Sequence, residues 1–179
     1  DDFAEGFIPN SINIGIDGNF AQWVGEMIPS VKQEILLVCE PGREEEVVTR
    51  LSRVGYDHTI GYLEGGFNTW KDSGKEVDTF TRISAMDLEN AMKDDSMLLI
   101  DVRKKSEYDS QFVNGSINIP LNEINQHLAT IPKDKKFAIN CAGGYRSMIA
   151  ASILKSRGWE NFVDVKGGFD AIKETEVPI

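Results

Sequence analysis

An internal repeat is the feature of this sequence that most restricts its fold. The run Ser11–Ile14 (Ser-Ile-Asn-Ile) recurs as Ser116–Ile119, and Gly65–Phe67 (Gly-Gly-Phe) recurs as Gly167–Phe169. A cysteine that ends an apolar run also repeats, and the matching positions lie 102 to 105 residues apart. Solenoid repeats have much shorter periods. The spacing therefore predicts two copies of one domain of ordinary size.

In the second copy, short apolar runs alternate with helical patterns. Ser84 and Asp87 have the spacing of a capping box, which predicts that a helix begins there. A buried strand at 137–140 precedes apolar residues at helical spacing over 147–154. This alternation predicts an α/β fold in which each domain has a mostly parallel sheet flanked by helices on both faces. Further strands are expected at 97–102, 116–119 and 161–165, and further helices at 84–92, 122–130 and 168–174.

The first copy is shorter than the second at its amino end. Its opening residues match Tyr108–Asn114, so it has no counterpart of the helix and strand expected at 84–102. A parallel sheet that lacks a strand has an exposed edge and a gap in its core. We therefore expect domains at 1–78 and 79–179, with the first N-terminally incomplete because the chain is a fragment of a longer protein. The polar segment Lys75–Arg82 is expected to be the linker between them.

Charge and composition restrict the classes of function. The net charge of −10 is concentrated in residues 1–80, which carry −9, whereas residues 81–179 carry −1. This balance disfavours nucleic-acid binding. The sequence has no apolar run long enough to span a membrane and no signal-peptide pattern, and its two cysteines lack the spacing of a disulfide framework. These features favour a reducing, cytoplasmic compartment, and the isolated His58 and His127 predict no metal site.

The segment Cys141–Ser147 (Cys-Ala-Gly-Gly-Tyr-Arg-Ser) joins the strand expected at 137–140 to the following helix. A helix N-terminus presents unpaired N–H groups and the positive end of the helix dipole, and a glycine-rich loop turns successive N–H groups toward an anion. With the positive charge of Arg146, these features lower the pKa of a cysteine thiol and make it a nucleophile. The alternative is that Cys141 is a small buried hydrophobe, as most free cysteines are. The adjacent glycines and the arginine favour the reactive interpretation.

The second copy contains, in order, the motifs Asp101–Arg103, Glu107–Tyr108, Gly115–Pro120, Cys141–Ser147 and Gly167–Phe169. Taken together, these motifs resemble the rhodanese (sulfurtransferase) domain family. The resemblance covers residues 82–179 and, over 3–74, the later two-thirds of a second domain. One departure is Gln111–Asn114, which stands where the family commonly has Gly-His-Ile-Pro and is interpreted as a scaffold turn. The tandem pair also resembles the C-terminal region of proteins in which a metallo-β-lactamase-like domain is fused to rhodanese domains.

The resemblance implies a sulfurtransferase without a metal or other cofactor. The Cys141 thiolate would take sulfane sulfur from thiosulfate or a persulfide donor and pass it, as a cysteine persulfide, to a thiol or to cyanide. Asp101 and Arg103 would organise the site. An upstream metallo-β-lactamase-like domain is an expected partner in the same chain. The loop residues implied in binding the persulfide are Ala142, Gly143, Gly144, Tyr145, Arg146 and Ser147.

The first copy carries Cys39-Glu-Pro-Gly-Arg-Glu-Glu-Glu46 at the equivalent position. Pro41 removes one N–H donor, and the surrounding glutamates oppose the formation of a thiolate. We therefore expect Cys39 to be a degenerate, structural counterpart of Cys141. The alternative is that Cys39 acts as a relay or resolving cysteine.

Two other functions compete with sulfur transfer. Cysteine phosphatases also hold a thiolate and an arginine in a strand–loop–helix cradle, but they usually place one more residue between the two than the four at 142–145. A non-catalytic regulatory or docking role is the other alternative, with the acidic first copy as the binding surface. The shorter loop favours sulfur transfer over a phosphatase, and the intact cysteine, glycines and arginine of the second copy favour an enzyme over a docking module.

Overall fold

The structure, a computed structural model, describes residues 2–94 and 96–179. The contacts within the chain define two compact units. Unit 1 comprises Thr79–Ile179 with the short segments 2–6 and 10–13, and unit 2 comprises Phe7–Pro9 and Ile14–Asp78. Among the described residues, no helix is long and apolar enough to cross a lipid bilayer.

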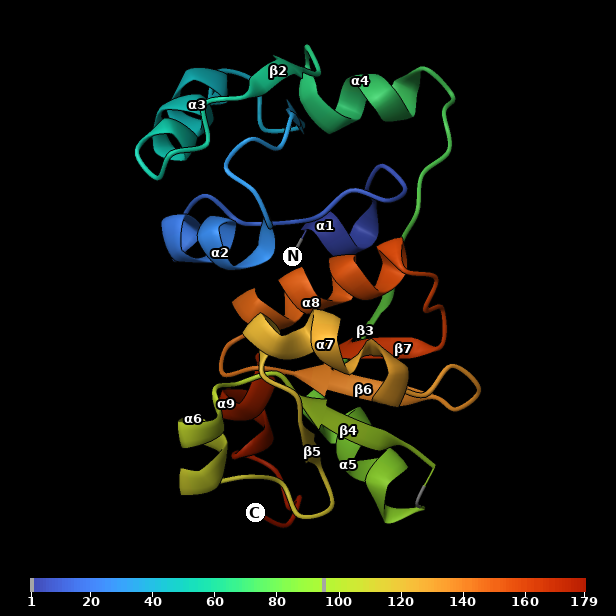
Figure 1. Cartoon of the computed structure of the whole chain (residues 1–179). Coiled ribbons are helices and arrows are strands. Elements are labelled where there is room, and N and C mark those ends of the chain that lie inside the picture. The colour runs from blue at the N-terminus through green and yellow to red at the C-terminus, as the bar shows by residue number, and fades with distance from the viewer. Residues whose placement is uncertain (1, 95) are drawn as a thin grey trace. The chain divides into compact units, whose positions relative to one another are not determined.

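Unit 1 is built around a parallel sheet (Figure 1). Each pair of neighbouring strands runs in parallel, with Asp101 opposite Asn140 and Arg82 opposite Asp164. The carboxyl ends of these strands therefore meet at one edge, where ligands of open α/β sheets bind. In spatial order the strands are β3 (Thr81–Ile83), β7 (Phe162–Val165), β6 (Phe137–Asn140), β4 (Leu98–Asp101) and β5 (Ile117–Asn118).

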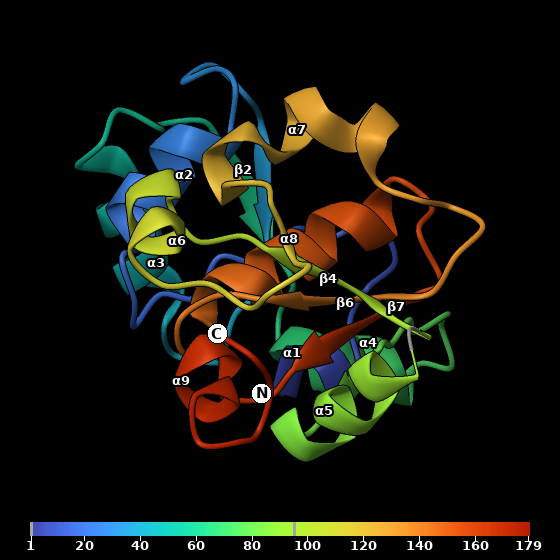
Figure 2. The same ribbon diagram turned by 90° about the horizontal axis from the view of Figure 1, so that it is seen from below.

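Helices cover both faces of this sheet, as Figures 1 and 2 show. On one face, α5 (Ala85–Lys93) and α9 (Gly168–Ile172) enclose a core that includes Leu88 and Phe169 with the strand residues Ala138 and Val163. On the other face, α8 (Tyr145–Ser156) contacts β6 and β7, and its residues 147–154 are all buried. The remaining elements of unit 1 are α1 (Asp2–Glu5), α6 (Lys105–Ser110), η1 (Leu121–Glu123), α7 (Ile124–His127) and η2 (Leu128–Thr130).

Unit 2 contains a parallel pair of strands, β1 (Ile35–Leu37) and β2 (Thr59–Tyr62). Its apolar core joins Leu37 to residues of α2 (Phe20–Met27) and α3 (Glu44–Ser52), and α4 (Gly66–Asp72) follows β2. The alternate side chains Leu36, Ile60 and Tyr62 are exposed. In unit 1 the matching positions are Ala138, Val163 and Val165, which are buried in the core beneath α5 and α9.

The α/β class with parallel sheets and flanking helices is confirmed. The capping box is also confirmed, because Ser84 Oγ accepts from the Asp87 N–H and the Asp87 carboxylate accepts from the Ser84 N–H. The prediction of Lys75–Arg82 as linker is wrong at its end, because Thr81–Ile83 forms the edge strand β3. This strand was not predicted because its three residues, with Arg82 at the centre, form no apolar run. The single helix expected at 122–130 is divided into η1, α7 and η2.

Candidate active site

Cys141 is the first residue after β6 and lies at the carboxyl edge of the sheet. The residue is buried, with an exposed fraction of 1%. Its Sγ accepts a hydrogen bond from the backbone N–H of Gly144 at 3.1 Å. The sulfur is therefore shielded from solvent but in contact with a peptide donor. Within a low-dielectric environment such a contact favours a sulfur anion more strongly than it would in water.

The N-terminus of α9 sets the orientation of the first peptide groups of the loop. The Phe169 N–H donates to the Cys141 carbonyl oxygen at 2.7 Å, and the Asp170 N–H donates to that of Ala142 at 3.0 Å. In a trans peptide the N–H group points away from the carbonyl of the same peptide unit, and the described chain has no cis peptide bond. The N–H groups of Ala142 and Gly143 therefore point away from α9, as an anion-binding nest requires.

Gly144 connects the loop to α8. It adopts φ 109°, a left-handed conformation that side-chain-bearing residues rarely adopt, and α8 begins at the next residue. The Ser147 hydroxyl donates to the Gly144 carbonyl oxygen at 3.2 Å. This turn directs the Gly144 N–H at the sulfur, so the thiol lies at the positive N-terminal end of a twelve-residue helix.

Arg146 is held by a carboxylate that the sequence analysis did not assign to the site. Its Nη1 and Nη2 donate to the two carboxylate oxygens of Glu107 at 2.5 and 2.8 Å. Glu107 lies on α6 and also accepts from the Lys104 N–H at 3.1 Å, so its carboxylate is fixed at the start of that helix. The hydrogen bond from Arg146 holds the pKa of Glu107 below its ordinary value. The pKa of Arg146 is raised, mainly by Glu107 and to a smaller extent by the Cys141 thiol.

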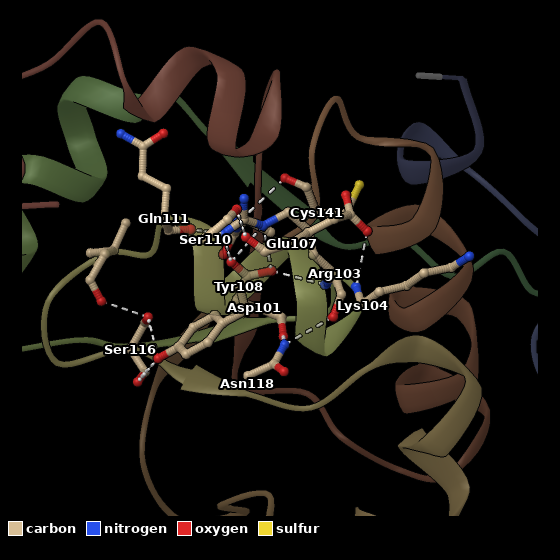
Figure 3. Close-up of polar contacts among 12 residues, drawn as sticks. Asp101, Arg103, Lys104, Glu107, Tyr108, Ser110, Gln111, Ser116, Asn118 and Cys141 are labelled. Atoms are coloured by element: carbon tan, nitrogen blue, oxygen red, sulfur yellow. Dashed lines mark hydrogen bonds and ion pairs between the residues drawn. The ribbon is translucent and has the colours of Figure 1, made fainter.

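Asp101 and Arg103 form a buried network beside the loop (Figure 3). The Asp101 carboxylate accepts from the Arg103 N–H at 2.8 Å and from Arg103 Nε at 2.8 Å. The Arg103 guanidinium lies 3.7 Å from the centre of the Phe169 ring and donates to the Gln111 carbonyl oxygen at 2.8 Å. Because Phe169 in turn holds the Cys141 carbonyl, this network connects β4 and the end of α6 to the helix that orients the loop.

The residues around the thiol differ in their access to solvent. Gly143 is exposed, Ala142, Tyr145 and Arg146 are half-buried, and Cys141 itself is buried. Burial raises the pKa of Tyr145 to about 12, so its hydroxyl is neutral at physiological pH. Gly143 forms the open side of the loop, because a Cβ placed on it would meet nothing within 4 Å.

The counterpart loop in unit 2 has different electrostatics. Cys39 is half-buried, and burial followed by the charge of Glu44 raises the pKa of its thiol. Arg43 donates to Asp17 at 2.7 Å and to Glu46 at 2.9 Å. Its charge is therefore engaged by carboxylates of the same unit.

Sequence reasoning missed three charged residues around Cys141. Glu107 binds Arg146, and Arg82 pairs with Asp164 next to the loop. Each pair joins residues far apart in sequence, so spacing gave no signal. Glu107 was noticed only as part of the motif Glu107–Tyr108, and that motif does not say which residue the carboxylate binds. Among the described residues, no group of three or more His, Cys, Asp or Glu side chains is placed to hold a metal ion.

Comparison with known proteins assigns the family. A family model described as Rhodanese-like domain matches residues 1–73 and again 84–175. The thiosulfate sulfurtransferase PspE of Escherichia coli is 36% identical over 80 residues, which cover 44% of this chain and 76% of that protein. A crystal structure of a rhodanese-like domain protein from Staphylococcus aureus matches with a TM-score of 0.51 and 27% identity, covering 56% of this chain and 98% of the other. The chain belongs to the rhodanese-like domain family.

A further relative is much longer than this chain. The adenylyltransferase and sulfurtransferase uba4 of Ogataea parapolymorpha is 44% identical over 72 residues, which cover 39% of this chain but only 18% of that protein. The two matched segments of the family model agree with the internal repeat found in the sequence.

Proposed function

We propose that unit 1 is a sulfurtransferase in which Cys141 carries the transferred sulfur. The observation that carries this proposal is the 3.1 Å hydrogen bond from the Gly144 N–H to Cys141 Sγ, within a loop whose first two carbonyls are held by α9. Sulfurtransferases among the relatives support the same class of reaction. A thiolate at a helix N-terminus is a nucleophile, and the same donors stabilise a persulfide anion.

The reaction has two displacement steps. The Cys141 thiolate attacks the outer sulfur of thiosulfate; a new S–S bond forms, the old one breaks, and sulfite leaves with the electron pair. A thiolate acceptor then attacks the outer sulfur of the Cys141 persulfide and leaves as a new persulfide, while the Cys141 thiolate is regenerated. With cyanide as acceptor the product is thiocyanate. With a persulfide as donor the thiolate of that donor, rather than sulfite, leaves with the electron pair in the first step.

The loop supplies most of the positive potential from its backbone. Arg146 is paired with Glu107 through both guanidinium Nη atoms, so much of its charge is neutralised within the site. The remaining donors are the N–H groups of Ala142, Gly143 and Gly144 together with the dipole of α8. We propose that this arrangement suits a single sulfur anion, which needs donors on several sides but little net charge.

Unit 2 is proposed to be non-catalytic. Cys39 has a raised pKa, and Arg43 is bound to Asp17 and Glu46. We also propose that a metallo-β-lactamase-like domain precedes unit 2 in the natural protein and supplies or consumes the sulfur. The sequence upstream of residue 1 in the natural gene product tests that part of the proposal directly.

The catalytic proposal is tested with two cysteine variants. The full chain is incubated with thiosulfate, its intact mass is recorded, and thiocyanate formation with cyanide is assayed. We expect the wild type and Cys39→Ser to gain about 32 Da, the mass of one sulfur atom, and to turn over, whereas Cys141→Ser gains nothing. Turnover by Cys141→Ser, or hydrolysis of p-nitrophenyl phosphate without thiocyanate formation, contradicts the proposal.

A further inference from the structure

A buried ion pair lies between the sheet and the start of α8. Arg82 on β3 and Asp164 on β7 are register partners, and Arg82 Nε donates to Asp164 Oδ2 at 2.8 Å. Their side chains are 10% and 0% exposed. The desolvation of two charges commonly cancels their attraction, so a buried pair is weak evidence for a role in stability. Its position next to the loop points to another role.

The Arg82 guanidinium lies beside the residue that donates to the sulfur. A Cβ atom placed on Gly144 would lie 3.7 Å from Arg82 Nη2. The N–H of the same Gly144 donates to Cys141 Sγ. Arg82 therefore occupies the space next to Gly144, on the side where another residue would carry its side chain.

We propose that Arg82 is a positioning residue for sulfur transfer, which limits the space around Gly144 and supplies a positive charge near the loop that carries the thiol, with Asp164 fixing its orientation. This inference rests on the proposed function of Cys141. Arg82 has no assigned part in the cradle formed by Arg146 and the loop amides, and it comes from the edge strand rather than from the loop.

Several other titratable groups lie around the thiol, and two further arginines there are each paired with a carboxylate. Arg146 on α8 is bound to Glu107 on α6, and Arg103 is bound to Asp101 after β4. Asp170 on α9 donates its backbone N–H to the loop, and the Tyr145 hydroxyl is neutral at physiological pH. Burial raises the pKa of Asp164, and the hydrogen bonds from Ser147 and, to a smaller extent, Arg82 oppose that rise.

The two charges of the pair give opposite predictions for the thiol. Removal of the positive charge by Arg82→Gln should raise the apparent pKa of Cys141 by about half a unit to one unit, because a nearby cation favours the thiolate. Removal of the negative charge by Asp164→Asn should lower it by a similar amount. A purely structural role predicts a displaced loop and a shift in the same direction in both variants.

The measurement is the alkylation rate of Cys141 against pH, made with iodoacetamide in a Cys39→Ser background. The matched control is Arg157→Gln, an exposed arginine at the C-cap of α8, the far end of the same helix. Arg82→Lys keeps the positive charge but has a smaller head group. It therefore separates the effect of the charge on the thiol from the effect of the guanidinium on the position of Gly144. It should leave the thiol pKa within a few tenths of a unit while lowering thiocyanate turnover about threefold or more.

The outcomes distinguish this inference from the proposed function. Opposite shifts with Arg82→Gln and Asp164→Asn support the role of Arg82, whether or not thiosulfate is turned over. Equal or absent shifts overturn it, even in an active enzyme. If Arg82→Gln fails to fold, Asp164→Asn and Arg82→Lys decide: a lowered pKa in the first and an unchanged pKa in the second support the inference, and any other combination contradicts it.

Discussion

The backbone N–H of Phe169 donates to the carbonyl oxygen of Cys141 at 2.7 Å, so the start of α9 holds the first peptide group of the Cys141–Ser147 loop. This contact explains why the sequence motif at 167–169 accompanies the cysteine loop. The close approach also requires a glycine at position 168, immediately before Phe169, because a Cβ on Gly168 would lie 2.3 Å from the Cys141 carbonyl oxygen. The orientation of the loop amides thus depends on a segment 28 residues further along the chain.

Gly168→Ala should displace the loop and abolish sulfur transfer. The added methyl group overlaps the Cys141 backbone, and the destabilisation should reach about 3 kcal/mol or more. Gly158→Ala is the matched control, because Gly158 also has a positive φ but its Cβ would meet nothing within 4 Å. That variant should lose only about 1–2 kcal/mol and keep its turnover. Denaturant melts and the thiocyanate assay measure both; equal activities of the two variants would refute the steric argument.

Glu107→Gln should weaken sulfur transfer without unfolding the protein. The substitution removes the charge that fixes the Arg146 guanidinium, and a charge-assisted bidentate contact contributes about 1–2 kcal/mol to such positioning. We expect kcat/KM for thiosulfate to fall about 5- to 30-fold. Glu160→Gln, which removes the exposed partner of Lys155 on α8, should leave kcat/KM unchanged. A loss shared by both variants would indicate a general effect of charge.

The same ion pair makes part of the stability dependent on pH. The pKa of Glu107 is lowered by Arg146 from its ordinary value of 4.5. A depressed pKa stabilises the folded state fully above the ordinary value, and this contribution is lost as the pH falls through the lowered pKa. The difference in Tm between wild type and Glu107→Gln should therefore be largest near neutral pH and shrink below pH 4.5. Thermal melts across that range test the sign, and a constant difference down to pH 3 contradicts it.

Much of the fold followed from local signals in the sequence. The strand at 137–140 is a continuous apolar run, and the capping box at Ser84 depends only on residues three positions apart, so both were predictable. The strand β3 was not, because three edge residues with Arg82 at the centre carry no pattern. The helix α6, a short polar segment of six residues, was missed for the same reason.

The candidate site shows a similar division. The loop between Cys141 and Ser147 was visible because its residues are contiguous. The pairs Arg146–Glu107 and Arg82–Asp164 were not visible, since their members are 39 and 82 residues apart. Sheet register brings Arg82 opposite Asp164, whereas Arg146 and Glu107 come from two helices, α8 and α6, that only the tertiary fold brings together.

Glu44→Gln should lower the pKa of Cys39, because it removes a negative charge that opposes the thiolate. Burial is the main cause of the raised pKa of this thiol, and the charge of Glu44 is the second. Glu45→Gln is the matched control, because Glu45 lies on the same helical turn but is exposed and has no part in that shift. The test is the alkylation rate of Cys39 against pH in a Cys141→Ser background. The Cys141→Ser protein without a further substitution is the reference. If its Cys39 reaches half of its maximal alkylation rate at a pH below 9.0, the ordinary pKa of a thiol, the raised pKa is contradicted and Cys39 is again a candidate relay cysteine.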